Sequence, residues 1–425
     1  MMVMLQKGNR RYYLFVILLY FFILKDWLEQ SVSVIGYFDE LFALLAVPYF
    51  ISQLLKDKFR LKIKRGGYSR HVIIFLLIGI IGSIIYSYQP FVSVALPDTF
   101  LCMKFWLSLY VGKQLFRKMD IRRYGKRIYF HVRLITGVYT LLVLVDNFGR
   151  IFPASIRYGL RSTQLMYSHP TVFVACCALL TMVLLSVRDY ARNYKVWLII
   201  QMLLICTTIR SKAFGTAMAI MLICYFVFYR KKKFSLRTLV LFAPLAVALG
   251  WNQIEYYFFS SIQSDSARYQ LLMASIEVAK DHFPLGSGFG TFASYYSGLS
   301  YSPLYEIYGL TNVNGLRQGA TSFVSDSFWP MVIGQTGFVG MVAFILAIVM
   351  LFKTIQKIRQ VSLSYYASAL CGMCYLLIAS MAESSFVHPL AVPIAMMIGL
   401  MLSQNDRNNI NEVNYEKIDN PYAHL

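Results

Sequence analysis

The chain has 425 residues, of which 58% are hydrophobic and 14% are charged, and its formal net charge is +21. A soluble domain usually carries about a quarter charged residues, so this composition excludes an ordinary water-soluble globule. A charge this positive would indicate a nucleic-acid partner in a soluble protein, but its placement along this chain argues against that.

Apolar segments of about 17–25 residues recur along the chain, which is the length a helix needs to cross a hydrocarbon core. We therefore predict an all-α polytopic membrane protein with about 12 transmembrane helices. In chain order these lie at 12–32, 34–55, 71–89, 92–112, 130–148, 166–187, 195–209, 213–229, 238–256, 329–352, 364–382 and 388–403.

The Lys and Arg residues cluster in alternate connections between these segments. The clusters lie around residues 7–11, 56–70, 113–133, 188–195, 230–237 and 353–359 and in the tail. By the positive-inside rule this side is predicted to be cytoplasmic, together with both termini. We expect no cleavable signal peptide, because the first apolar segment lacks a small-residue cleavage site and is typical of a signal anchor. No nucleic-acid partner is expected.

This pattern divides the chain into four parts. Residues 1–256 hold the first nine helices, 257–328 form a large external loop, 329–403 hold the last three helices and 404–425 form a cytoplasmic tail. The loop is too long for a plain linker, so we expect it to fold against the helices.

The external loop contains a predicted amphipathic helix that begins near Ser264–Ser266 and runs to about Asp281. Its apolar positions have helical spacing and are predicted to face the membrane surface. They are Tyr269, Leu272, Met273, Ile276 and Ala279. Pro284 and Gly286 should end this helix.

Three glycines follow this helix in "FPLGSGFGTF": Gly286, Gly288 and Gly290. A phosphate-binding loop is one interpretation, but such loops follow a strand rather than a helix. Nucleotides are also absent outside the cell, where the loop is predicted to lie. We instead expect the glycines to turn tightly and bring the backbone close to another ligand.

Several cations break the positive-inside pattern and are predicted to lie at the external face. They are Arg157, Arg161, Arg210, Lys212 and Arg268. Guanidinium groups match phosphate oxygens, so this set predicts a pocket for an anionic group. The alternative for each is contact with lipid headgroups.

Carboxylates at this face include Asp326 and Glu383, and the nearby histidines include His169 and His282. Each histidine has a structural role as its alternative. The sequence has no external motif with the spacing of metal ligands, so we expect no metal and no cofactor. All seven cysteines lie inside predicted spans, so no external disulfide is expected. The loop tyrosines, Tyr295 and Tyr296 among them, suit either sugar stacking or a membrane-surface belt.

The chain resembles the O-antigen ligase and polysaccharide polymerase superfamily, of the Wzy type. The resemblance covers most of the chain and is most specific over 258–350. It depends on Arg268 in a helix, then "FPLGSGFGTF", "SDSFW" and "GQTGFVGMVAF", with "RYGLRSTQLMYSHPT" and "RSKAFGTAMA" upstream. Ligases of the superfamily carry a histidine in the polar element before the late span. Here that element is Ser325-Asp326-Ser327, which favours a polymerase.

The resemblance implies a GT-C-like, metal-independent glycosyltransferase that polymerises polyprenyl-pyrophosphate-linked oligosaccharides at the outer face of the cytoplasmic membrane. The product would be a surface polysaccharide, either O-antigen or capsule. It implies catalytic roles for Arg210, Arg268 and Asp326. Substrate-binding roles would fall to Arg157, Arg161, His169, Lys212, His282, Gly286, Gly288, Gly290 and Glu383, with Glu383 an alternative base. Expected partners are the lipid-linked substrates, membrane lipids, a chain-length regulator and a flippase.

Two other functions remain open at this point. A ligase would transfer polymer to a lipid or wall acceptor, and a flippase or transporter would move the lipid-linked sugar. A transporter predicts inverted repeats and broken polar helices at mid-membrane. The sequence has no clear half-to-half repeat, and its polar residues gather at the external face.

Overall fold

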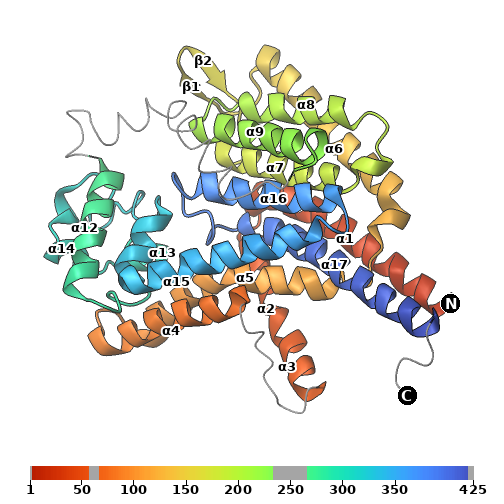
Figure 1. Cartoon of the computed structure of the whole chain (residues 1–425). Coiled ribbons are helices and arrows are strands. Elements are labelled where there is room, and N and C mark those ends of the chain that lie inside the picture. Colours follow the sequence, from red (N-terminus) through yellow and green to blue (C-terminus); the bar gives the residue numbers. More distant parts are fainter. Residues whose placement is uncertain (1, 57–66, 233–265, 420–425) are drawn as a thin grey trace, which may run out of the picture.

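The computed structural model describes residues 2–56, 67–232 and 266–419, and most of these residues are helical. The predicted span at 238–256 lies outside them. Figure 1 shows long helices running side by side, with both termini at one end of the bundle. A mostly helical, apolar chain confirms the predicted class of all-α membrane protein.

The helices have these bounds: α1 (Met2–Glu29), α2 (Phe38–Leu44), α3 (Ala46–Lys56), α4 (Tyr68–Tyr86), α5 (Leu96–Leu115), α6 (Ile121–Gly149), α7 (Pro170–Ser186), α8 (Tyr194–Cys206), α9 (Ser211–Cys224), α12 (Ala267–Asp281), α13 (Tyr295–Leu299), α14 (Leu304–Ile307), α15 (Phe328–Ile358), α16 (Leu363–Ala379) and α17 (Ala391–Asp419). Shorter helical turns are η1 (Ser33–Tyr37), η2 (Phe91–Ala95), η3 (Arg188–Tyr190), η4 (Tyr225–Tyr229) and η6 (Leu310–Asn312). Strands β1 (Ser155–Arg157) and β2 (Leu160–Ser162) form an antiparallel hairpin in which Ile156 lies opposite Arg161.

Six helical segments in the described residues are long and apolar enough to cross a membrane: Ser33–Gln53, Tyr68–Tyr86, Phe91–Leu115, Ile121–Gly149, Ser211–Tyr229 and Phe328–Ile358. The predicted span at 34–55 is not one continuous helix, because it divides into η1, α2 and α3. Asp39 and Glu40 lie in the first turn of α2, where the helix dipole favours negative charge.

The centre of the bundle is apolar. Helix α7 is buried along its whole length, as expected of a helix that is hydrophobic on every side. It packs against α16, α6 and α8, while α17 packs against α5, α4 against α15 and α12 against α15.

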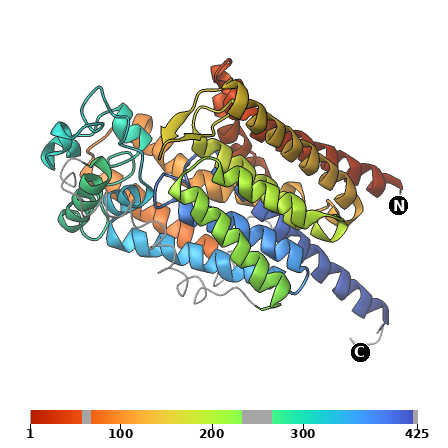
Figure 2. The same ribbon diagram turned by 90° about the horizontal axis from the view of Figure 1, so that it is seen from above.

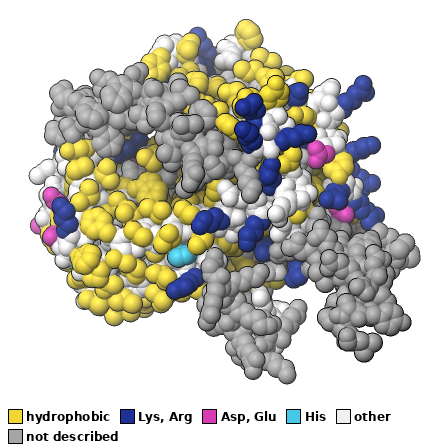
Figure 3. Space-filling view, viewed as in Figure 1, with side chains coloured by type: hydrophobic (Ala, Val, Ile, Leu, Met, Phe, Trp, Pro, Cys, Tyr) yellow, Lys and Arg dark blue, Asp and Glu magenta, His cyan; other side chains and the backbone are white. Residues whose placement is uncertain are grey.

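The two ends of the bundle differ in composition. Helix α1 begins, and α17 ends, where the termini lie, whereas α12, α13 and α14 cover the opposite end (Figures 1 and 2). Figure 3 shows that Lys and Arg side chains on this face gather toward the end with the termini, while hydrophobic side chains cover a broad area elsewhere. This segregation follows the alternation of basic connections in the sequence.

Helix α12 confirms the predicted loop helix, and the structure shows which of its faces packs on the bundle. The buried positions include Leu271, Ala274, Ser275 and Val278, which belong to a helix packed on α15. Of the residues expected to face the membrane surface, Tyr269, Leu272, Met273 and Ile276 are half-buried or exposed, whereas Ala279 is buried, so the prediction is wrong for Ala279. The helix buries its small residues because these allow close approach to α15.

The glycine segment fits into a break in α15. Gly337 has non-helical angles inside that helix (φ 61°, ψ −174°), so nearby carbonyls lose their helical partners. The backbone N–H groups of Ser287 and Gly288 donate to the carbonyls of Gly334 and Gln335, at 3.0 and 2.9 Å. Two of the sequence motifs that carry the family resemblance therefore bind each other.

Candidate functional site

A cavity of about 1730 Å³ lies at the end of the bundle opposite the termini. It is lined by residues from the end of α1, η1 and α2, the start of α5, the starts of α7, α9, α12 and α15, and the α16–α17 connection. These segments border the connections that lack the basic clusters. Polar residues from distant parts of the chain therefore meet in one place.

Of the five cationic side chains that line this cavity, four come from three segments other than α5: Arg157, Arg210, Lys212 and Arg268. Arg157 ends β1, Arg210 precedes the first residue of α9 and Arg268 lies in the first turn of α12. The N-termini of α9 and α12 add partial positive charge to this part of the wall. We call these four residues the cationic wall.

Two carboxylates pair with this wall. Asp326 Oδ2 accepts from Arg268 Nε at 2.9 Å and from a second guanidinium nitrogen at 2.5 Å. Glu383 accepts from Lys212 Nζ. Burial raises the pKa of Asp326 above its usual range, and Arg268 opposes this rise. Its carboxylate is thus more basic than an exposed aspartate and is paired with Arg268.

His169 lies beside the cationic wall and caps α7. Its side chain accepts a hydrogen bond from the backbone N–H of Thr171 at 3.3 Å. Burial, together with the nearby cations Arg210 and Lys212, lowers the pKa of His169 to about 4. His169 is therefore neutral at physiological pH and adds no charge to the cavity.

Five of the predicted site residues lie elsewhere: Arg161, His282, Gly286, Gly288 and Gly290, none of which lines the cavity. Arg161 pairs with Asp146 at 3.0 Å and bonds the Phe152 carbonyl, which fixes the hairpin to α6. The glycines are enclosed by backbone: a Cβ on Gly286 would lie 2.3 Å from Gly337 N. They are packing residues in this structure, since no space for a ligand remains beside them.

His282 has a structural environment as well. Its side chain is 5% exposed and lies between the Tyr88 hydroxyl and the Val278 carbonyl, each at 2.8 Å. These contacts connect the end of α12 to the segment after α4.

We expect His282→Ala to lower the free energy of unfolding by about 1–3 kcal/mol, because buried polar partners lose their hydrogen bonds. Substrate turnover per folded molecule should not change. Thermal unfolding of the purified protein in detergent measures the first effect. Tyr88→Phe removes one of the same bonds and is the matched control. A loss of turnover without a loss of stability would instead indicate that His282 binds substrate.

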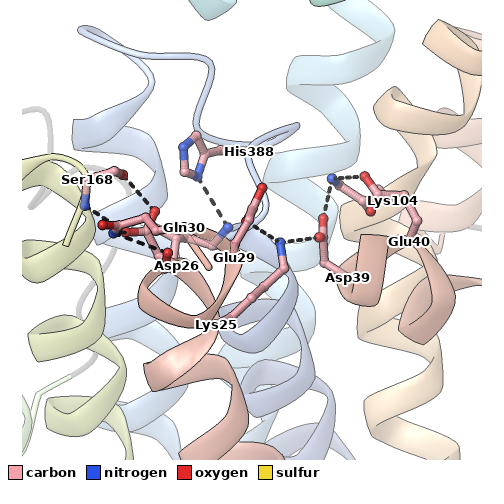
Figure 4. Close-up of polar contacts among 10 residues, drawn as sticks. Lys25, Asp26, Glu29, Gln30, Asp39, Glu40, Lys104, Ser168 and His388 are labelled. Carbon is pink, nitrogen blue, oxygen red and sulfur yellow. Dashed lines mark hydrogen bonds and ion pairs between the residues drawn. The ribbon is translucent and has the colours of Figure 1, made fainter. Parts of the chain in front are cut away.

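One cluster of charged side chains was not predicted from the sequence. Lys25 Nζ and Lys104 Nζ approach Asp39 from opposite sides, at 2.6 and 2.5 Å (Figure 4). Lys104 also donates to Glu40 at 3.1 Å. These lysines and Asp39 are at least nine-tenths buried, so each buried charge is stabilised by the opposite charge beside it. Ionisable residues inside apolar segments were the available signal. Which of these residues pair was not predictable, because they lie far apart in sequence.

A second set of contacts in Figure 4 fixes the end of α1 to the start of α7. The Asp26 carboxylate accepts from the backbone N–H of Ser168 at 2.8 Å and from its hydroxyl at 2.7 Å. Asp26, Ser168 and His169 all line the cavity. The cavity wall is thus held by polar contacts between helices that are remote in sequence.

No protein-family model matches this chain, and no curated protein matches it. Over the residues that the structure describes, no group of three or more His, Cys, Asp and Glu side chains is placed to hold a metal ion.

Proposed function

We propose that this chain is a membrane glycosyltransferase that polymerises polyprenyl-pyrophosphate-linked oligosaccharides at the outer face of the cytoplasmic membrane. The observation that carries the proposal is the cationic wall, where four cations from three segments line one cavity beside Asp326 and Glu383. The resemblance to Wzy-type polymerases supports the same function.

Gathering four cations in a partly buried cavity is unfavourable without an anion to offset their repulsion. Two carboxylates of the protein offset it in part. The excess positive charge suits a diphosphate, whose oxygens accept bidentate hydrogen bonds from guanidinium groups. A lipid-linked diphosphate would also place its polyprenyl chain among the apolar helices.

The proposed reaction is a displacement at the anomeric carbon of the donor sugar. A hydroxyl oxygen of the acceptor sugar bonds to that carbon as the bond to the pyrophosphate oxygen breaks. The hydroxyl proton passes to a carboxylate, and polyprenyl pyrophosphate leaves with the electron pair. The cationic wall stabilises the negative charge that develops on the leaving oxygen.

Arg268 connects donor binding to base strength in this scheme. It pairs with Asp326 in this structure. When Arg268 turns to the pyrophosphate, Asp326 loses the cation that lowers its pKa and becomes a stronger base. Lys212 and Glu383 form an equivalent pair. Substrate binding thereby releases the carboxylate that the next step requires.

The proposal includes the finer topology: about twelve spans, a GT-C-like arrangement and both termini in the cytoplasm. The basic clusters at the end with the termini support this orientation. The same orientation gives the cavity access to lipid-linked substrate in the outer leaflet, where a chain-length regulator and a flippase would be its partners.

Asp326→Asn should reduce the polymerisation rate by about 10²–10⁴-fold, because an amide does not accept the hydroxyl proton. In the wild type, the rate should fall as the pH drops through the raised pKa of Asp326, because only the ionised form is a base. The variant should lose this acid limb while retaining donor binding. An unchanged pH profile in Asp326→Asn would assign the base to Glu383, and Glu383→Gln is the paired variant.

Deletion of the gene followed by gel analysis of the surface polysaccharide tests the function itself. A product reduced to single repeat units supports the polymerase. Polymer that remains unattached to its acceptor would instead indicate a ligase, and lipid-linked repeats trapped inside the cell would indicate a flippase.

A further inference from the structure

We infer that the cavity contains a second subsite, made by Asp98, Glu40 and Tyr296, that binds the hydroxyl groups of a neutral saccharide. The inference rests on the proposed function in one respect. In the proposed reaction, this saccharide would be the acceptor sugar, whose hydroxyl oxygen attacks the donor. The three residues line the same cavity as the cationic wall but come from α5, α2 and α13.

Asp98 is the first observation. Its side chain is 1% exposed, yet it lines the cavity. Its Oδ2 accepts from the backbone N–H of Gly290 at 2.8 Å and from Gln335 Nε2 at 2.9 Å, and the Ser294 side chain also contacts the carboxylate. Its Oδ1 receives no hydrogen bond from any described residue. A buried acceptor without a donor is costly, so this oxygen is suited to a donor from a ligand.

Glu40 gives the second observation. Its Oε1 accepts from Lys104 Nζ at 3.1 Å, while its Oε2 is buried without a donor among the described residues. Lys104 is also paired with Asp39, so it cannot neutralise Glu40 alone. Asp98, Leu101 and Lys104 follow one another at three-residue spacing and present one face of α5 to the cavity.

The charge of this part of the cavity decides which ligand it suits. Four carboxylates line it, namely Asp26, Glu29, Glu40 and Asp98, and Lys104 is the lining cation beside them. A phosphate is repelled here, whereas sugar hydroxyls donate hydrogen bonds to carboxylates. The cavity thus has a cationic wall suited to a diphosphate and an acidic wall suited to a hydroxyl-rich group.

Tyrosines at the acidic wall complete the subsite. Tyr37, Tyr295 and Tyr296 line the cavity, and the rings of Tyr295 and Tyr296 lie 5.3 Å apart at 84°. Burial raises the pKa of the Tyr296 hydroxyl, and the charges of Tyr295, Asp98 and Glu40 add to this rise. The Tyr296 ring can stack on the apolar face of a sugar, and its hydroxyl can exchange hydrogen bonds with the sugar hydroxyls, which Tyr296→Phe removes.

The test uses the full chain in detergent and two separate probes, each titrated by calorimetry. One probe is inorganic pyrophosphate. The other is the phosphate-free oligosaccharide that mild acid releases from the polyprenyl-linked saccharide of the source cells. Glu40→Gln and Tyr296→Phe should each weaken oligosaccharide binding about tenfold and leave pyrophosphate binding unchanged. Arg268→Ala should weaken pyrophosphate binding and leave oligosaccharide binding unchanged.

Glu306→Gln and Tyr229→Phe are the matched controls, because both residues are exposed and lie outside the cavity. They should leave both affinities unchanged. Asp98→Asn should also weaken oligosaccharide binding. Because Asp98 also holds Gly290, Glu40→Gln decides the matter if Asp98→Asn does not fold.

The outcomes separate this inference from the proposed function. Equal oligosaccharide binding by wild type, Glu40→Gln and Tyr296→Phe overturns the subsite. So does wild type that binds pyrophosphate but no oligosaccharide, and that result leaves the polymerase proposal standing. Oligosaccharide binding that depends on Glu40, without any pyrophosphate binding, supports the subsite and overturns the polymerase proposal.

Discussion

Arg268→Ala is expected to abolish polymer formation while folded protein remains in the membrane. Arg268 is the member of the cationic wall that pairs with the predicted base, so its loss removes both a phosphate ligand and the partner of Asp326. Removing one preorganised donor from a developing oxyanion typically costs about 10²–10³-fold in rate. A larger loss is expected here, since the remaining Asp326 carboxylate repels the pyrophosphate.

The measurement is the length distribution of surface polysaccharide in a deletion strain that carries each variant, with membrane protein quantified by immunoblot. Arg268→Lys should restore part of the activity, because it retains the charge but loses the bidentate fork. Arg317→Ala is the matched control, since Arg317 is an exposed arginine of the same segment, between α12 and α15, that does not line the cavity. Normal chain length in Arg268→Ala would refute the role of the cationic wall.

Arg210→Ala belongs to the same prediction and should also abolish polymer. Arg210 enters the cavity from the start of α9, far from Arg268 in sequence, so it tests whether the wall acts as a unit. If Arg268→Ala is inactive and Arg210→Ala is fully active, the phosphate site would be confined to the α12 side of the cavity.

Gly288→Ala is expected to lower the free energy of unfolding by about 2–6 kcal/mol, combining backbone strain with overpacking. Gly288 has a φ of +95°, and a Cβ there would lie 2.3 Å from Ser83 N and 2.5 Å from Ser83 Cα. These are backbone atoms of α4, so the helix itself would have to move. The segment would then leave the break in α15, and the carbonyls of Gly334 and Gln335 would lose their donors.

Thermal unfolding in detergent measures this loss, and Gly309→Ala is the control. Gly309 also has a positive φ, +68°, but no atom lies within 4 Å of the position of its Cβ. Gly309→Ala should therefore lower the free energy of unfolding by only about 1 kcal/mol, from backbone strain alone. Equal destabilisation by the two substitutions would show that crowding against α4 contributes nothing.

The sequence by itself determined the class of protein and the location of most apolar helices. Length and hydropathy were sufficient because each membrane helix must satisfy its backbone within one continuous segment. Alternating basic connections also predicted which segments share an end of the bundle. Arg157, Arg210, Lys212 and Arg268 do meet at one cavity, with Asp326 and Glu383 beside them. The identity of the pairs, Arg268 with Asp326 and Lys212 with Glu383, was not predictable.

The tertiary structure decided which conspicuous residues face the cavity and which are packing residues. Gly286 and Gly288 have the composition of a ligand loop, yet they pack against α15 and α4, at the place where Gly337 breaks α15. His282 is held by Tyr88 and the Val278 carbonyl instead. Asp98 and Lys104 each stand alone in an apolar segment and Glu40 follows Asp39, so the costly charges were visible in sequence but not which of them meet. Only the packing of α2 against α5 places them at one wall, which Tyr296 of α13 also lines. Local sequence determines helices because helical hydrogen bonds are local, whereas a site assembled from distant segments depends on how those helices pack.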